Sequence, residues 1–593
     1  MKRIMIGCLA MVGALTVTVV GIGITIGWWL WSSHADSKTR LGDRIVLQID
    51  GTLFGADRSS PLSGVFGRGR PALRDVVLTL DRASRDPRVL GVVVDLSSAG
   101  VSMTAVQELA PVVRSLRAAG KLTVAHADTF GEPEGRMAYL LASGFERVMM
   151  QPSGDLPEIG VALERPYLAR ALERVGIRAE MGERYEHKGG IDMLVATGLS
   201  DALRDSLTTL VDDLHSQIVS GIATGRGLPR AAVQQLFQNA PLSAEAARAA
   251  GLIDSIGYWD QAEALAQRHP GGPVDLVDLA DYAVSLPKPS GPQIALISAR
   301  GPVVRSSGET GDLFGTGPQM AADRIAAAFD QAIADPEIKA ILFRIDSPGG
   351  SYVASDTIAR SVRRAREAGK PVVVSMGGIA ASGGYFAAFE ANHILAHPAT
   401  LTGSIGVYGG KIHVAQLLER LDITVERVSA GHVSGLDDPL RPLSEDDRRR
   451  LEASLDRIYV DFSTRVGRAR RLEGAALDAA ARGRVVSGQR ARQLGLVDEE
   501  GGYLAALAAA RRLAGLPEGS PVTLVSLPRD DDELQQVLRL LEEFGGIQLS
   551  LAQLRASLSA LAQLVNQIGL PPLSRDMSLT APGVPPDLGG IGR

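Results

Sequence analysis

The stretch "ADPEIKAILFRIDSPGG" (residues 334–350) has a counterpart in "RDPRVLGVVVDLSSAG" (residues 85–100), with Asp335 matching Asp86, 249 positions earlier. Each begins with an Asp-Pro pair and continues into a β-branched apolar run, as a buried strand does. The same offset aligns "AAGKLTVAH" with "EAGKPVVVS", and an offset of 244 still aligns "GLID" (251–254) with "GLVD" (495–498). The sequence therefore predicts one module written twice.

Each copy alternates apolar strands with helical segments. "RIVLQI" (44–49) and "QIALIS" (293–298) are strand-like, and helices are expected over 72–84, 321–334 and 445–468. Strands that are apolar throughout, alternating with helices, indicate an α/β fold whose parallel sheet is covered on both faces.

The predicted boundaries follow the repeat and the changes of composition around it. They are an N-terminal anchor with its flank at 1–43, a first repeat at 44–268, a linker at 269–292, a second repeat at 293–515, and a tail at 516–593. The linker has Pro and Gly at its ends, which is typical of a domain boundary. The tail is expected to hold two amphipathic helices, packed on the domain, a neighbouring subunit or a membrane surface, and a disordered end.

The N-terminus is predicted to span a lipid bilayer. Residues 4–31 carry no charge over 28 positions, whereas a helix crosses the apolar core with about 20 residues. Trp28, Trp29 and Trp31 fit an interfacial aromatic belt. A cleaved secretory signal ending at "SHA" (33–35) is the alternative.

Composition excludes several classes of function. A formal net charge of -5 gives no electrostatic reason to expect nucleic acid as a partner. The only cysteine is Cys8, so intramolecular disulfides and cysteine metal sites are excluded. No metal-ligand cluster is visible, and no cofactor is predicted.

The two copies differ where chemistry is expected. The second has "AASGGYF" (380–386) with Ser382 at a strand–helix turn, where the first has "FGEPEGRMAYL" and no equivalent serine. The first copy has Lys188 in "YEHKGG" (185–190), where the second has Ser434. This reciprocal loss suggests one composite site shared by the two halves.

The motifs "DSPGG" (346–350), "AASGGYF", "TLTGSIGV" (400–407) and "YEHKGG" resemble the long, duplicated form of signal peptide peptidase A, or protease IV. The resemblance covers roughly residues 1–515. It implies a Clp protease/crotonase-like module in tandem, and a homotetramer on the outer face of the bacterial inner membrane. It also implies a serine protease cleaving apolar peptides such as signal-peptide remnants, with Ser382 as nucleophile, Lys188 as general base and Ser404 bonded to the lysine.

The chemistry agrees with that resemblance. A serine hydroxyl needs a base, and a lysine serves once burial lowers its pKa from about 10.4. A tetrahedral intermediate also needs backbone N–H donors. Gly383, after the serine, and Gly350 are the expected oxyanion hole, with Gly349 next. The substrate is expected to lie extended beside "LTGSIGV" (401–407).

Other interpretations stay open. Ser382 could pair with His393 or His397, and His187 could be mistaken for the base. The "SPGG" segment could be only a tight turn, with Ser347 as a turn residue. The function could instead be that of a crotonase-like acyl-CoA enzyme or a non-catalytic membrane scaffold.

Overall fold

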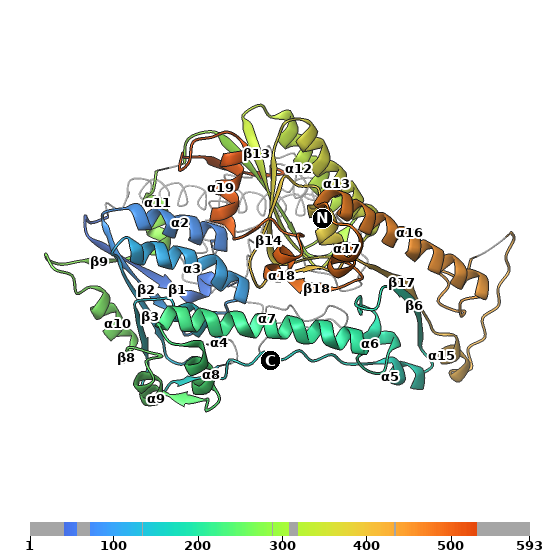
Figure 1. Cartoon of the computed structure of the whole chain (residues 1–593), viewed down its shortest axis with the longest axis horizontal. Coiled ribbons are helices and arrows are strands. Elements are labelled where there is room, and N and C mark those ends of the chain that lie inside the picture. Colours follow the sequence, from blue (N-terminus) through green and yellow to red (C-terminus); the bar gives the residue numbers. More distant parts are fainter. Residues whose placement is uncertain are drawn as a thin grey trace, which may run out of the picture.

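The computed structural model describes residues 41–55, 71–132, 135–287, 289–306, 318–431 and 434–529. Two separate sheets, one in each repeat, carry the fold (Figure 1). The first has the strand order β8-β4-β3-β2-β1-β9, and the second β18-β16-β14-β13-β10-β20, with β15 beside β14 and β19 beside β15. The strands of both sheets run parallel except for β18. The predicted α/β class and the duplication are confirmed.

The strands of the first sheet are β1 (Ile45–Asp50), β2 (Val89–Asp95), β3 (Leu122–Ala127), β4 (Arg147–Met150), β8 (Ser255–Ile256) and β9 (Asp275–Asp278). The strands of the second are β10 (Gln293–Arg300), β13 (Ile338–Ser347), β14 (Val372–Ala381), β15 (His393–Ala396), β16 (Leu401–Gly403), β18 (Val485–Ser487), β19 (Glu499–Glu500) and β20 (Thr523–Leu527). Outside these sheets lie β5 (Asp155–Leu156) with β7 (Leu242–Ser243), β6 (Arg178–Arg184) with β17 (Val407–His413), and β11 (Val303–Val304) with β12 (Met320–Ala321).

The helices of the first repeat are a 3-10 turn at Gly51–Phe54, α2 (Leu73–Arg85), α3 (Met103–Ala118), α4 (Gly135–Ala142), α5 (Ala169–Arg174), α6 (Asp192–Val195), α7 (Asp201–Arg226), α8 (Arg230–Phe237), α9 (Ala244–Ala249), α10 (Trp259–Ala266) and α11 (Leu279–Ser285). Those of the second are α12 (Ala322–Ala334), α13 (Tyr352–Glu367), α14 (Gly383–Ala388), α15 (Ala415–Arg420), α16 (Glu445–Arg470), α17 (Gly474–Ala480), α18 (Gly488–Gln493) and α19 (Tyr503–Leu513).

The long helices begin and end where local chemistry sets their limits. The Ser444 side chain accepts a hydrogen bond from the Asp447 N–H at the start of α16, and three acidic residues occupy its first turn. Acidic residues near a helix N-terminus and arginines near its C-terminus favour the helix dipole, and α16 ends in Arg468 and Arg470. The helices expected at 72–84, 321–334 and 445–468 correspond to α2, α12 and α16, within two residues at each end.

Each sheet is covered on both faces, as predicted. In the first repeat, alternate β1 side chains such as Leu47 pack against α2 and α3, whereas Val46 packs against α10. In the second, Ile297 faces α12 and α13, whereas Leu296 faces α19. Because successive side chains of a strand point to opposite faces, two covered faces require strands that are apolar throughout.

The segments flanking the second repeat contribute strands as well. The predicted linker, 269–292, holds β9 and α11, and β9 pairs with β1 at the edge of the first sheet. Beyond residue 515, β20 pairs with β10 at the edge of the second sheet. These two short edge strands obtain their hydrogen bonds from partners far away in the chain, so local composition does not reveal them.

The predicted bilayer span, residues 4–31, and both predicted tail helices lie outside the described residues. In the part of the chain that is described, none of the helices is both long and apolar enough to cross a membrane.

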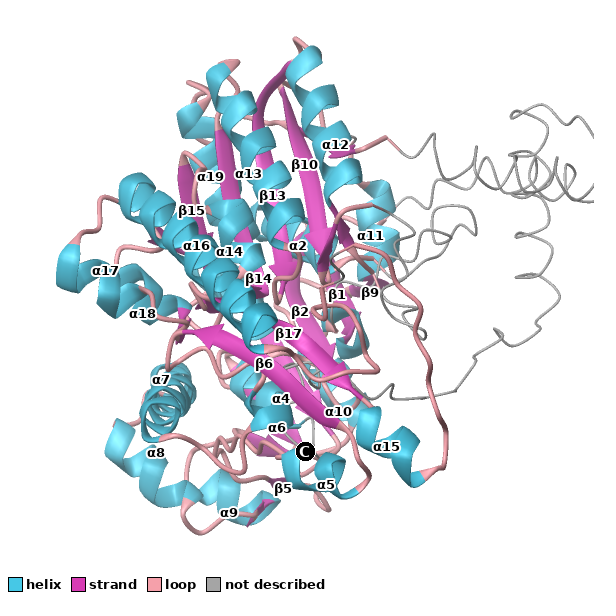
Figure 2. Ribbon diagram, turned by 90° about the vertical axis from the view of Figure 1, so that its right-hand side faces the viewer, coloured by secondary structure: helices cyan, strands magenta, loops and turns pink. Residues whose placement is uncertain are grey.

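The two repeats are joined by a pair of antiparallel strands and by polar side-chain contacts. Strand β6 of the first repeat pairs antiparallel with β17 of the second over seven residue pairs, and α16 packs against both (Figure 2). Helix α7 lies along β18, where Asp213 bonds Ser487 and Arg490. These contacts bring the segment after β6 to the end of β14.

Candidate active site

Ser382 lies between the end of β14 and the first residue of α14. Its backbone has φ 53° and ψ -117°, a region that residues other than glycine seldom adopt, and its N–H donates to the Gly403 carbonyl at 2.9 Å. The turn is tight: a Cβ on Gly383 would lie 2.5 Å from Ser355 Oγ, and one on Gly384 would lie 2.7 Å from the Ser347 carbonyl. A strained, tightly packed serine at a strand–helix turn is typical of a nucleophile held ready.

Lys188 reaches that serine from the other repeat. It lies four residues beyond β6, and its Nζ is 3.0 Å from Ser382 Oγ, 2.9 Å from Ser404 Oγ and 2.8 Å from the Ser404 carbonyl oxygen. The side chain is buried, and two glycines make room for it: a Cβ on Gly483 would lie 2.5 Å from the Lys188 backbone nitrogen, and one on Gly406 would lie 3.0 Å from Lys188 Cδ.

The environment of this amine disfavours its charged form. Burial lowers the pKa of Lys188 from 10.5 to about 7, and the nearby Glu183 carboxylate opposes this shift only in part. A neutral amine has two N–H groups and one lone pair. Because the carbonyl and hydroxyl oxygens of Ser404 each accept one of these N–H groups, the lone pair remains available to the Ser382 hydroxyl.

Ser404 occupies the turn after β16 with φ 51°, and its N–H donates to the Arg484 carbonyl at 2.7 Å. The predicted hydrogen bond between this serine and the lysine amine is present in the structure. The Ser404 carbonyl makes a second bond to the amine that was not predicted.

The strand before Ser404, β16, is paired with β14 on one edge and with β18 on the other. The expectation that a substrate lies beside residues 401–407 is therefore wrong at 401–403, because both edges of that strand are occupied.

The predicted oxyanion glycines separate into two kinds. The Gly350 and Gly383 N–H groups have no acceptor among the described residues, and the Gly350 nitrogen lies 3.1 Å from where a Gly383 Cβ would be. The Gly349 N–H already donates to Ser347 Oγ at 3.2 Å. A Cβ on Gly349, which has φ 105°, would lie 2.8 Å from Ser382 Cβ, so this glycine provides clearance.

The three histidines considered as alternative bases are bonded to residues other than Ser382. His397 Nε2 lies 2.9 Å from Glu108, and His393 Nε2 lies 2.9 Å from Glu499. His187 is bonded through Nδ1 to Ser206 Oγ at 2.7 Å, and its Nε2 lies 2.6 Å from Arg484. Burial, assisted by Arg484, lowers the pKa of His187.

Two residues near the lysine were not predicted from the sequence. Burial, with repulsion from Asp192, raises the pKa of Glu183 to about 7, and its Oε2 has no hydrogen-bond partner among the described residues. Arg484 touches His187 with its side chain and Ser404 with its carbonyl. Neither residue belongs to a motif, so only its spatial contacts reveal it.

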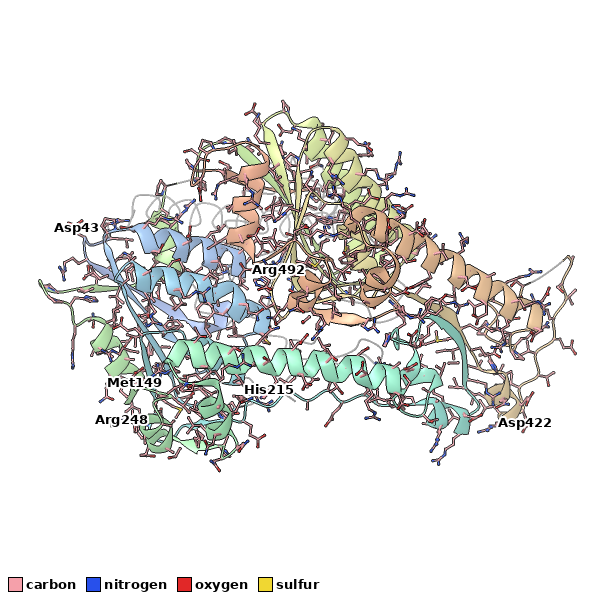
Figure 3. All side chains as sticks on the ribbon, viewed as in Figure 1. Asp43, Met149, His215, Arg248, Asp422 and Arg492 are labelled. Carbon is pink, nitrogen blue, oxygen red and sulfur yellow. The ribbon has the colours of Figure 1, made fainter. Side chains whose placement is uncertain are left out.

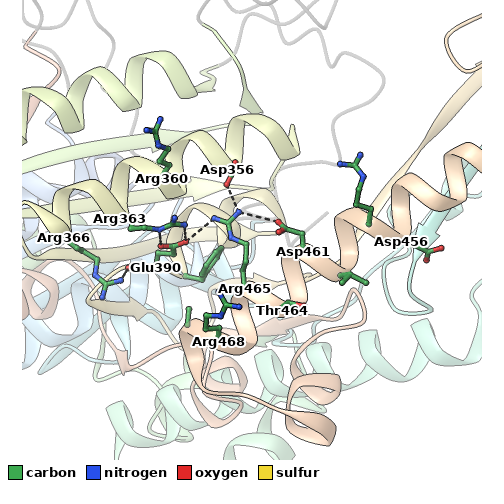
Figure 4. A pocket seen from close by; sticks show the side chains of 14 residues that line it. Asp356, Arg360, Arg363, Arg366, Glu390, Asp456, Asp461, Thr464, Arg465 and Arg468 are labelled. Atoms are coloured by element: carbon green, nitrogen blue, oxygen red, sulfur yellow. Dashed lines mark hydrogen bonds and ion pairs between the residues drawn. The ribbon is translucent and has the colours of Figure 1, made fainter.

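A groove of about 1040 Å³ between α13 and α16 contains none of the predicted site residues (Figure 4). It is charged, with Arg465 bonded to Asp356, Glu390 and Asp461. The described part of the chain contains no group of three or more His, Cys, Asp or Glu side chains arranged to hold a metal ion.

A duplicated α/β fold with a serine beside a buried amine defines a candidate serine hydrolase. The chain belongs to Peptidase family S49, whose sequence pattern matches residues 117–271 and 364–517, one stretch in each repeat. It is a serine protease of the signal peptide peptidase A type, as the resemblance predicts.

Relatives of known name agree with this assignment. The chain is 27% identical to Protease 4 of Salmonella typhi over 84% of its own length and 82% of that protein. It is 30% identical to the chloroplastic serine protease SPPA of Arabidopsis thaliana over 77% of its length and 68% of that protein. A mutant ClpP1 from Listeria monocytogenes aligns with 36% of this chain and 94% of its own at 14% identity, with a TM-score of 0.23, too low to carry an argument.

Proposed function

We propose that the protein is a membrane-anchored endopeptidase whose Ser–Lys dyad is shared between the two repeats. The observation that carries this proposal is the 3.0 Å contact between Lys188 Nζ and Ser382 Oγ, together with the burial that lowers the lysine pKa to about 7. A nucleophile within hydrogen-bond reach of a base that is partly neutral at pH 7 is what acyl transfer requires.

The chemistry follows from these positions. The Lys188 lone pair takes the proton as Ser382 Oγ attacks the peptide carbonyl, and the resulting ammonium donates that proton to the leaving amine. The developing oxyanion is stabilised by the free N–H groups of Gly350 and Gly383, a stabilisation worth about 3 kcal/mol for each donor. Ser404 holds the amine in place throughout. Water then attacks the acyl-enzyme with the same lysine as base.

The proposed substrates are apolar peptides, including signal-peptide remnants after their release. This class is carried over from the resemblance and agrees with an uncharged span at residues 4–31, which would hold the enzyme where such remnants arise. The proposed location is the outer face of the bacterial inner membrane, and the proposed assembly is a homotetramer.

The test is hydrolysis of an apolar peptide ester by the wild type, Ser382→Ala and Lys188→Ala. Loss of activity in both variants, with unchanged thermal unfolding, supports the dyad. Activity that survives Lys188→Ala refutes it. Hydrolysis of an acyl-CoA thioester in place of the peptide ester would favour the crotonase-like alternative, and no hydrolysis of either by the wild type would favour a scaffold.

A further inference from the structure

A turn of the second repeat packs against the lysine of the first. Residues 482–484 join α17 to β18, and both Arg482, at φ 58°, and Gly483, at φ 85°, are in the left-handed region. The glycine permits a close approach, because a Cβ at this position would lie 2.5 Å from the Lys188 backbone nitrogen. Its own N–H donates to the Ile405 carbonyl at 2.8 Å. The turn is therefore held against the lysine backbone.

Arg482 binds the residues that precede the lysine. Its guanidinium bonds both carboxylate oxygens of Glu186, at 2.8 and 2.9 Å, and its carbonyl accepts the His187 N–H at 3.3 Å. The guanidinium also lies 4.8 Å from the centre of the Tyr185 ring. Because the pair of Arg482 and Glu186 is partly exposed to solvent, it adds little free energy by itself. Its effect is to fix the path of the chain that leads into Lys188.

Arg484 contacts both sides of the site. Its Nη2 lies 2.6 Å from Nε2 of His187, the residue before the lysine, and its carbonyl accepts the Ser404 N–H at 2.7 Å. A guanidinium can only donate hydrogen bonds, so Nε2 accepts one and the proton of this neutral imidazole is on Nδ1. That N–H lies 3.1 Å from the Ala202 carbonyl and 2.7 Å from Ser206 Oγ. One arginine thus bonds the neighbour of the base and the serine that bonds the base.

The internal repeat associates these arginines with the lysine. Helices α9 and α18 have equal lengths and begin 244 residues apart. With that offset, Arg482 and Arg484 correspond to Gln238 and Ala240, so the first repeat lacks both arginines. The lysine is present only in the first repeat and the arginines only in the second, which is the reciprocal pattern that the nucleophile and the base also follow. A contact that served only to join a helix to the next strand would be expected in both copies.

We propose that Arg484 is a positioning residue that holds Lys188 against the nucleophile. This inference rests on the proposed Ser–Lys dyad, and Arg484 acts through His187 without touching the reacting atoms. Without its guanidinium, the turn and His187 would separate and water would reach the lysine amine. Burial is what disfavours the charged amine, so the pKa of Lys188 would rise and a smaller fraction of it would be neutral at pH 7.

The test measures the rate at which a fluorophosphonate labels Ser382 in the full chain, in detergent, from about pH 6 to 10. The wild-type midpoint is expected near pH 7. Arg484→Met should raise the midpoint by about one pH unit, so that labelling at pH 7 falls roughly fivefold. His187→Phe removes the acceptor but keeps a ring, and should raise the midpoint similarly. If Arg484 acts through His187, the double variant should show no larger change than either single variant.

Arg490→Met is the matched control. Arg490 also joins the two repeats, by bonds of 2.9 and 3.0 Å to Asp213, and Figure 3 labels His215 and Arg492 on α7 and α18, the helices that this pair connects. In the described part of the chain, none of its hydrogen bonds reaches the lysine or the residues next to it. Arg490→Met should therefore lower the thermal unfolding temperature, as Arg484→Met does, but leave the midpoint of labelling unchanged.

Three outcomes would overturn the inference. They are a wild-type midpoint in Arg484→Met, an equal change in Arg490→Met, or additive changes in the double variant. If Arg484→Met does not fold, the midpoint of His187→Phe decides by the same criterion. Lys188→Met separates the inference from the proposed function. A profile unchanged in Lys188→Met refutes the dyad itself, whereas a profile that depends on Lys188 but not on Arg484 refutes the positioning role alone.

Discussion

The site geometry makes a specific prediction about how the rate of Ser382 acylation depends on pH. Only the neutral form of Lys188 can take the serine proton, and burial sets its pKa at about 7 in place of 10.5. The neutral fraction then rises from roughly one in eleven at pH 6 to ten in eleven at pH 8. We expect the acylation rate to rise about tenfold over that interval and to level off above it.

A lysine of ordinary pKa would behave differently. Its neutral fraction at pH 7 would be roughly one in 3,000, and the rate would climb about tenfold with every pH unit to beyond pH 9. The difference between the two pKa values corresponds to roughly 5 kcal/mol of disfavoured charge. The plateau, more than the rate itself, therefore reports the burial of the amine.

The assay is the second-order rate of covalent labelling by a fluorophosphonate, with Ser382→Ala as the background. A rate that still climbs at pH 9, or a profile unchanged in Lys188→Met, would refute the reasoning. Stability gives a second readout. The unfolded chain holds a proton on Lys188 between about pH 7 and 10.5 that the folded chain does not, so unfolding free energy should rise with pH across that window. Lys188→Met should remove this rise.

Three further predictions concern the surroundings of the dyad and a buried ion pair between the two repeats. Glu183→Gln removes a carboxylate that raises the Lys188 pKa, so the midpoint of the labelling profile should move to lower pH. Gly350→Ala should abolish labelling, because the new Cβ would lie 2.3 Å from the Val303 carbonyl beside the free N–H; activity equal to wild type would exclude Gly350 from the oxyanion hole. Glu108→Ala should lower the free energy of urea unfolding by about 3 kcal/mol, because it leaves His397 buried without its partner, and an unchanged midpoint would contradict this.

The sequence was informative wherever the signal is local or repeated. Helices α2, α12 and α16 were predicted within two residues because their apolar spacing and terminal residues are read over a few turns. The duplication was visible because two copies align over long stretches. The reciprocal loss of residues between the copies selects Ser382 and Lys188, and the resemblance to a family supports both and adds Ser404.

Only the tertiary structure decided how those residues meet. The 3.0 Å contact between Lys188 and Ser382 joins residues 194 positions apart, through strand pairing that no local pattern encodes. The pKa of the lysine depends on burial between the repeats, and the availability of each glycine N–H depends on which acceptor reaches it first, as Ser347 does for Gly349. The sequence by itself identified the serine hydroxyl, the lysine amine and the glycine N–H groups as candidates. Their distances and charges arise from contacts between distant parts of the chain, because burial and pairing are properties of the folded whole.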